Sequence, residues 1–299
     1  MMTRIISENN LAIACLLFSA SLWGLIWYPL RLLNEAGMSG IWSSLVMYLA
    51  AAVLTLPMIF KNRQGQLQGD KVILLALALA AGVTNVAFVV ALIQGEVMRV
   101  MLLFYLSPLW TVLIGRWWLK ERLSRRAIIF FCVAMLGSVV MLWNPELGKP
   151  WPKGLSDWLA LLAGIAFSVN NVIARKLSTQ SMAIKTAATW WGVVFVSIAV
   201  ILTTQAAWPN VSSSLWLGAW FLGWLGIVAM TVAVLYGLAK MPVYRSSVIM
   251  LFELIVAAVA AWLLTDETMT MQEWVGGVMI LLAAFGVARI SVPKKNDVI

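Results

Sequence analysis

Residues 97–121 read VMRVMLLFYLSPLWTVLIGRWWLKE, and this stretch decides the class of the fold. Arg99 and Arg116 enclose a run in which no residue is charged and most residues are apolar. A helix needs about 20 such residues to cross the hydrocarbon core of a bilayer. The stretch is therefore predicted to be a transmembrane helix.

The composition extends this prediction to the whole chain. Of the 299 residues, 63% are hydrophobic and 11% are charged, and the mean hydropathy is +0.94. A soluble domain has about 45–50% apolar and about 25% charged residues, and a water-soluble fold cannot hide the excess. We therefore expect an all-α integral membrane protein in contact with lipid. The net charge of +9 then indicates topology rather than a nucleic-acid partner.

Walking along the chain gives ten stretches that are long and apolar enough to span a membrane. They are residues 11–30, 42–60, 72–93, 97–119, 127–143, 155–174, 184–203, 215–238, 243–264 and 274–290. No clear small-residue cleavage site follows the first stretch, so it is expected to stay as the first helix rather than act as a signal peptide.

The basic residues predict the orientation of these spans. If the N-terminus lies inside, 17 of the 21 Lys and Arg residues fall on the cytoplasmic side. The exceptions are Arg31, Arg99, Lys149 and Lys153. Short cytoplasmic loops are rich in Lys and Arg, so both termini are expected in the cytoplasm, with the protein in a bacterial inner membrane.

A weak internal repeat divides the chain into two halves of five spans each. A shift of 146 residues lays 97–121 over VYRSSVIMLFELIVAAVAAWLLTDE (243–267) and places Arg99 on Arg245. Five is an odd number, so the second half must cross the membrane in the opposite sense. We therefore expect two inverted five-helix repeats, residues 1–147 and 148–299, with a substrate site between them.

Several stretches resemble the EamA-type members of the drug/metabolite transporter superfamily. They are WGLIWYPLRLL (23–33), LSPLWTVLIGRWWLKERLS (106–124), FSVNNVIARKLS (167–178) and FELIVAAVAAWLLTDETMTMQEWVGGVMILLAAFGV (252–287). The similarity covers essentially the whole chain as two EamA-like repeats. It implies ten helices, a central cavity lined mainly by spans 1, 3, 4, 6, 8 and 9, and export of small metabolites.

Two positions depart from the family pattern. Glu253-Leu254 stands where such proteins usually have Glu-Pro, which argues against a shared kink in the ninth span. Phe167 stands where a Trp is common in the sixth span.

Glu253 is the strongest candidate for a functional residue because it lies near mid-depth in the ninth span. A charge there costs at least about 2.5–3.5 kcal/mol, so the side chain should face protein or water rather than lipid. It would then serve as a proton-coupling carboxylate or as the counter-charge of an amino or cationic group. The alternative is a protonated, hydrogen-bonded acid that stabilises helix packing.

Further polar and aromatic residues are candidates for the cavity wall. Asn85, Asn170 and Asn171 lie inside apolar spans, where a carboxamide needs hydrogen-bond partners from a substrate or from a neighbouring helix. The resemblance places Trp23, Tyr105 and Tyr236 on cavity-lining spans, where rings can stack on a substrate or cover a cation. Packing between helices is the alternative role for all six.

Arg99 and Arg245 occupy equivalent positions of the two repeats. They could bind an anionic group, but we expect both to extend to the membrane interface. The chain has no His and only two Cys, Cys15 and Cys132, so neither a metal site nor another cofactor is predicted. It also lacks a phosphate-binding GxxxxGK[ST] motif and any visible catalytic cluster, which argues against an enzyme.

The sequence thus predicts a secondary transporter that works by alternating access and exports small amphipathic metabolites, such as amino acids. Coupling to protons through Glu253 is a hypothesis, and facilitative exchange without protons is an alternative. A non-transporting membrane scaffold or receptor is a second alternative. Monomer and homodimer are both left open.

Overall fold

A computed structural model describes residues 2–57, 71–144, 151–265 and 268–290, and its regular structure is helical. The helices of the first half are α1 (Met2–Glu35), α2 (Gly40–Val53), α4 (Lys71–Gln94), α5 (Val97–Phe104), α6 (Ser107–Ile114), the π-helical turn η2 (Gly115–Leu119) and α7 (Arg125–Leu142). Those of the second half are α8 (Leu155–Lys176), α9 (Met182–Thr204), α10 (Ser213–Phe221), the π-helical turn η4 (Leu222–Ile227), α11 (Val228–Lys240), α12 (Val243–Met250), α13 (Phe252–Leu264) and α14 (Met271–Arg289).

The predicted class, an all-α integral membrane protein, is confirmed. In the described ranges, nine helical stretches are long and apolar enough to cross a membrane. The remaining predicted span, 42–60, corresponds to α2, which has 14 residues, and residues 58–60 lie outside the described part. At 1.5 Å per residue α2 is about 21 Å long, shorter than a hydrocarbon core of about 30 Å.

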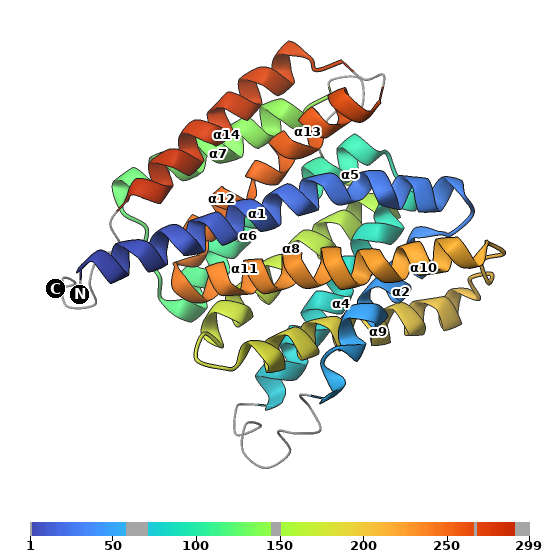
Figure 1. The fold of residues 1–299 in the computed structure, drawn as a ribbon. Helices are drawn as coiled ribbons and strands as arrows, with labels where there is room; N and C mark the ends of the chain where they lie inside the picture. Colours follow the sequence, from blue (N-terminus) through green and yellow to red (C-terminus); the bar gives the residue numbers. More distant parts are fainter. Residues whose placement is uncertain (1, 58–70, 145–150, 266–267, 291–299) are drawn as a thin grey trace.

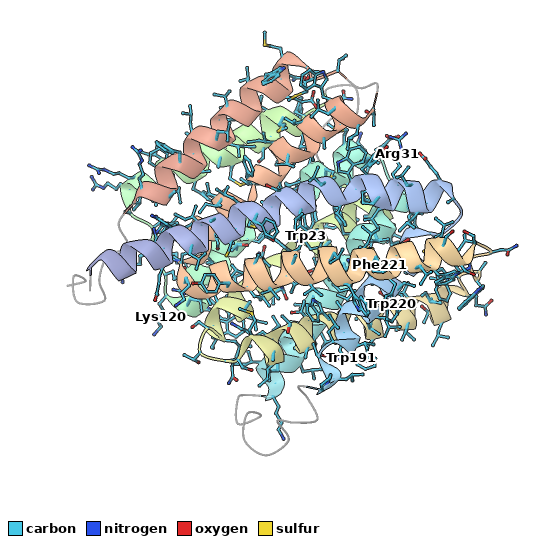
Figure 2. The ribbon with its side chains drawn as sticks, viewed as in Figure 1. Trp23, Arg31, Lys120, Trp191, Trp220 and Phe221 are labelled. Carbon is cyan, nitrogen blue, oxygen red and sulfur yellow. The ribbon has the colours of Figure 1, made fainter. Side chains whose placement is uncertain are left out.

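Apolar side chains cover the outside of the helices (Figure 2). Phe221 on α10 is 54% exposed, and Leu202 and Leu225 are each more than 70% exposed. This exterior is suited to lipid rather than to water.

Short hydroxyl side chains set the start of several spans. Ser124 accepts a hydrogen bond from the Ala127 N–H at the start of α7, and Ser181 accepts one from the Ile184 N–H at the start of α9. Thr270 and Glu273 form a capping box that begins α14. Such caps satisfy amide groups that have no partner within the helix. They place these helix starts two or three residues before the predicted ones.

The main helix contacts join the two halves of the chain. α1 packs against α11 and α13, while α8 packs against α4, α5 and α6. α2 packs against α9, and α7 lies along α14 (Figure 1). Gly137 and Gly276 bring α7 and α14 close, because a Cβ on either glycine would lie within 3 Å of the other's carbonyl oxygen.

The helices that open the two halves run in opposite directions. Lys240, at the end of α11, forms an ion pair with Glu8 near the start of α1 at 3.2 Å. Arg175, near the end of α8, donates to the carbonyl of Ala239 in the same part of α11 at 2.6 Å. α1 therefore begins where α8 ends. We call this the Glu121 end of the molecule, because Arg175 also pairs with Glu121 there. α14 ends at the same place (Figure 1).

The fourth and ninth spans both break in the middle. α5 gives way to α6 at Tyr105 and Leu106, and α12 gives way to α13 at Leu251, 146 residues after Tyr105. Pro108 lies in the first turn of α6, where it has no N–H to lose from the helix. The ninth span has no proline, so the expectation of no kink there is wrong.

At both breaks the backbone forms hydrogen bonds from residue i to residue i−3. The Leu106 N–H donates to the Leu103 carbonyl, and the Leu109 N–H donates to the Leu106 carbonyl. In the ninth span the Leu251 N–H donates to Val248 and the Leu254 N–H to Leu251. These i to i−3 bonds tighten the chain locally at equivalent places, with or without proline.

Candidate functional site

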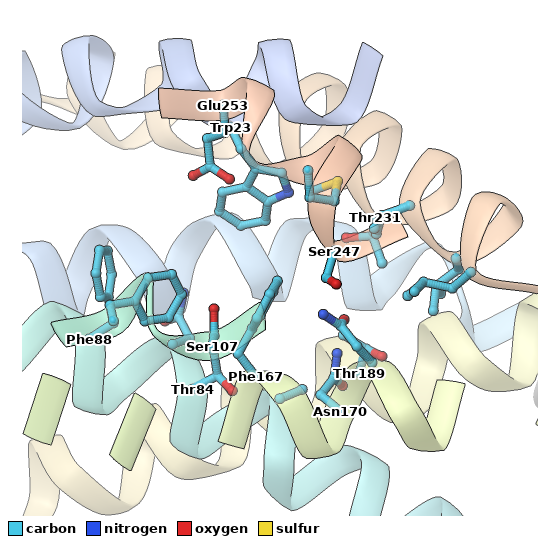
Figure 3. A pocket seen from close by; sticks show the side chains of 18 of the residues that line it. Trp23, Thr84, Phe88, Ser107, Phe167, Asn170, Thr189, Thr231, Ser247 and Glu253 are labelled. Atoms are coloured by element: carbon cyan, nitrogen blue, oxygen red, sulfur yellow. The ribbon is translucent and has the colours of Figure 1, made fainter. Parts of the chain in front are cut away.

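The two breaks border a cavity of about 150 Å³ at the centre of the molecule (Figure 3). Helices from both halves of the chain contribute to its wall. The lining residues are Trp23, Tyr48, Ala81, Thr84, Asn85, Phe88, Phe104, Tyr105, Ser107, Pro108, Phe167, Asn170, Asn171, Thr189, Val193, Thr231, Val234, Leu235, Leu238, Ser247, Met250, Leu251 and Glu253.

Glu253 lies directly after the break in the ninth span and brings a carboxyl group to the cavity. The Tyr105 hydroxyl, at the break of the fourth span, interacts with this carboxylate. Figure 3 shows Glu253 beside the ring of Trp23 from α1. α1 can approach this closely because residue 24 is glycine: a Cβ there would lie 2.6 Å from the Glu253 carbonyl oxygen.

The facing wall carries amide and hydroxyl groups from α4, α8 and α9. Figure 3 shows Asn170 and Thr189 across the cavity from Glu253. The side-chain oxygens of Asn85, Asn170 and Thr189 are buried without a protein hydrogen-bond partner. The side chain of Asn85 also interacts with the Tyr48 hydroxyl. Because buried polar atoms normally have partners, these three oxygens are available to a ligand or to water.

Aromatic rings from three helices form the apolar part of the wall. The Phe104 ring lies 4.5 Å from that of Phe88, 5.3 Å from that of Tyr105 and 5.6 Å from that of Phe167, between ring centroids. Tilted and edge-on rings at these distances attract one another. The cavity therefore combines an aromatic cluster with a small set of hydrogen-bonding groups.

Six of the seven predicted site residues line this cavity, namely Trp23, Asn85, Tyr105, Asn170, Asn171 and Glu253. Tyr236 does not: it packs against the cluster around Leu16, and its ring lies 5.9 Å from the Lys240 ammonium. In α11 the cavity face is formed by Thr231, Val234, Leu235 and Leu238, which follow helical spacing, and Tyr236 is about 100° away from Leu235.

The sequence did not single out the hydroxyl side chains of the wall. Thr84 and Ser247 each donate to a carbonyl of their own helix, and Thr231 accepts from the Trp190 indole N–H. Such bonds are common in apolar helices, so these residues carry no distinctive signal. Ser107 is the exception, because the 146-residue shift places it on Glu253.

One end of the molecule is closed by a buried ion pair between the halves. Arg99 at the start of α5 lies 2.6 Å from the Asp157 carboxylate at the start of α8 and also donates to the Trp151 carbonyl. The expectation that Arg99 and Arg245 extend to the interface is wrong. Arg99 is 8% exposed and Arg245 is 1% exposed, and Arg245 donates to the Ala288 carbonyl.

The Glu121 end is closed by a second link between the halves. The Glu121 carboxylate accepts from Arg175 Nε at 3.3 Å and from the Val243 N–H at 2.8 Å. Burial raises the pKa of Glu121, and the bonds from Val243 and Arg175 offset part of this rise.

Metal chemistry has no support in the part of the chain that the structure describes. There, no three His, Cys, Asp or Glu side chains gather in a way that could hold a metal ion. Within the cavity wall, Glu253 is the only charged residue.

Comparisons with known proteins agree with this architecture. The model of the EamA-like transporter family matches residues 10–143 and again residues 154–289. A protein of Archaeoglobus fulgidus described as an uncharacterized transporter is 24% identical over 220 residues, covering 70% of this chain and 73% of that protein. A solved crystal structure has the same fold, with a TM-score of 0.75 at 16% identity over 95% of this chain and 99% of that one.

Proposed function

The chain belongs to the EamA-like transporter family, and on this basis we propose that it is a secondary transporter that exports small amphipathic metabolites by alternating access. As a multi-pass membrane transporter, it binds a small-molecule substrate and sits in lipid. The observation that carries the proposal is the cavity between the halves, which holds one carboxyl group at the break of a span.

The cavity favours a small substrate with an N–H-bearing group and an apolar body. Its volume of about 150 Å³ is that of a cavity that holds benzene. Glu253, Asn85 and Asn170 offer oxygen atoms, which suit an ammonium or another nitrogen donor. The rings around Phe104 suit an apolar side chain. Amino acids and related amines have this combination.

The two end links are the contacts that alternating access would break in turn. We take residues 1–147 and 148–299 as inverted repeats that rock against each other around the cavity. In one state the Arg99–Asp157 pair opens, and in the other the Glu121–Arg175 pair opens. The excess of Lys and Arg supports an orientation in which the Glu121 end, with both termini, faces the cytoplasm of a bacterial cell.

Proton coupling is assigned to Glu253. A carboxylate can hold either a proton or an ammonium group, and competition between the two would couple export to proton entry. Tyr105, which reaches Glu253 from the other half, would report the state of this carboxylate to the fourth span.

The test is transport in proteoliposomes, with a panel of amino acids and amines and an imposed pH gradient. The native protein should move at least one panel member faster when the gradient is present. Glu253→Gln should abolish the effect of the gradient, whereas Glu96→Gln, at an exposed acid before α5, should not. Unchanged gradient dependence in Glu253→Gln would refute the coupling. Transport by the native protein that ignores the gradient would indicate facilitative exchange.

A further inference from the structure

A second hollow lies on the outside of the molecule, between the start of α7 and the end of α14. It lies at the Glu121 end of the molecule. It is separate from the central cavity, because no residue of α7 or α14 lines the cavity wall. Its described lining consists of Arg126, Phe130, Leu282, Phe285, Gly286, Arg289 and Ile290. We call it the α7–α14 groove.

The groove combines two positive charges with apolar walls. Arg126 and Arg289 are both exposed, and no acidic residue belongs to the described lining. The Arg289 guanidinium lies 3.9 Å from the centroid of the Phe285 ring, which holds it at the edge of the groove. Leu282 and Phe285 are 61% and 58% exposed on the surface that faces lipid.

The opposite end of the same helix pair differs. There, α7 ends and α14 begins, and neither residues 139–144 nor residues 268–275 contain Lys or Arg. The acid Glu273 stands in the first turn of α14 instead. The positive charges are therefore confined to one membrane surface, which a general lipid-packing groove would not require.

We propose that the α7–α14 groove binds one anionic phospholipid of the surrounding bilayer. The phosphate would lie between Arg126 and Arg289, and an acyl chain would follow Phe130, Leu282 and Phe285 along the two helices. Guanidinium groups bind phosphate through paired hydrogen bonds, and basic pockets between transmembrane helices bind anionic headgroups. A soluble phosphate would leave these apolar walls uncovered, so the lipid is the source that fits both parts of the groove.

Native mass spectrometry of the full-length protein in detergent tests this proposal. The protein is titrated with phosphatidylglycerol and with phosphatidylcholine of the same acyl chains. We expect one phosphatidylglycerol bound at least tenfold more tightly than phosphatidylcholine. The double variant Arg126→Gln/Arg289→Gln should bind it about 30-fold more weakly, since each basic residue at the headgroup contributes roughly a fivefold step in affinity.

A matched control removes the same number of positive charges from two arginines next to the groove. Arg122→Gln/Arg125→Gln changes two exposed arginines that do not line it, and the affinity should fall less than threefold. Arg126→Lys/Arg289→Lys keeps both positive charges and should keep most of the affinity for phosphatidylglycerol. This result would show that the groove tolerates substitution at the two positions. Equal binding of both lipids, or equal losses in both Gln double variants, would overturn the proposal. Displacement of the lipid by millimolar inorganic phosphate, or a dimer lost only in the groove variant, would overturn it too.

Discussion

Gly24 shows how one residue positions the cavity carboxyl group. A Cβ at this position would meet three atoms of α13 at 2.6–3.1 Å, and two of these atoms belong to the backbone. Backbone atoms cannot swing aside as the tip of a side chain can. The contact between α1 and α13 therefore depends on the absence of a side chain at residue 24.

We accordingly predict that Gly24→Ala destabilises the protein by about 1–3 kcal/mol, the usual cost of overpacking. It should also lower transport, because the added methyl group would push α13 away from α1 and would move Glu253 away from Trp23. Gly218→Ala is the control, since a Cβ there meets nothing within 4 Å. Thermal unfolding in detergent measures the stability of both variants. Equal melting temperatures for the two variants would contradict this account of the contact.

Glu121 links stability to pH at the residue scale. Burial raises its pKa, so the folded protein binds this proton more tightly than the unfolded chain does. The stabilisation from this proton is complete below the ordinary value of 4.5 and is lost as the pH rises through the raised pKa. The ionised form, which pairs with Arg175, is the form present above that range.

The prediction concerns the difference between Glu121→Gln and the native protein. Gln does not titrate, so the variant's melting temperature should rise relative to that of the native protein as the pH increases from about 4.5. Scanning fluorimetry in a series of buffers would show this trend. Parallel curves, with a constant offset at every pH, would mean that Glu121 has no raised pKa.

At the scale of elements, the break in the ninth span does not need a proline. The Leu254 N–H donates to Leu251 rather than continuing a regular helix, and the equivalent position in the fourth span is Pro108. A proline at residue 254 would lose this one hydrogen bond, but in the first turn of α13 it would interrupt no regular i to i−4 bond. Leu254 itself is 4% exposed, so any replacement also loses packing.

We predict that Leu254→Pro costs only about 0.5–1.5 kcal/mol more than Leu254→Ala, which removes similar packing but keeps the N–H that donates to Leu251. Ala258→Pro, within the regular part of α13, should cost about 3 kcal/mol or more because it removes a helical hydrogen bond and adds a clash. The melting temperatures of the three variants give the comparison. If Leu254→Pro exceeded Leu254→Ala by as much as Ala258→Pro exceeds the native protein, the break would not interrupt the helix.

For the whole molecule, the sequence was sufficient to predict the helical membrane fold and six of the residues that line the cavity. Long apolar runs and a charged residue at mid-depth are physical signals that do not depend on tertiary detail, and Glu253 was found this way. Tyr236 was misplaced because depth along a helix says nothing about the face on which a residue lies. α2 ends at Val53, within the predicted span 42–60, whose last residues 58–60 lie outside the described part of the chain.

The buried arginines could not be predicted for a related reason. Arg99 lies close to a span end, where extension to the interface is usual, and its partner Asp157 is 58 residues away in the other half. The break in the ninth span was not predicted either, because backbone hydrogen bonds from residue i to residue i−3 require no particular residue type. The partners of the two arginines come from other helices, Asp157 for Arg99 and the Ala288 carbonyl for Arg245.

The central claim is that the cavity beside Glu253 opens alternately to the two sides of the membrane. Ser247→Cys, in a background with Cys15 and Cys132 replaced by alanine, places one thiol in the cavity wall. An impermeant thiol reagent is then applied to either side of sealed vesicles. We predict labelling from both sides, with Asp157→Asn increasing labelling from the Arg99 end and decreasing it from the Glu121 end. Labelling from one side only, unaffected by Asp157→Asn, would contradict alternating access.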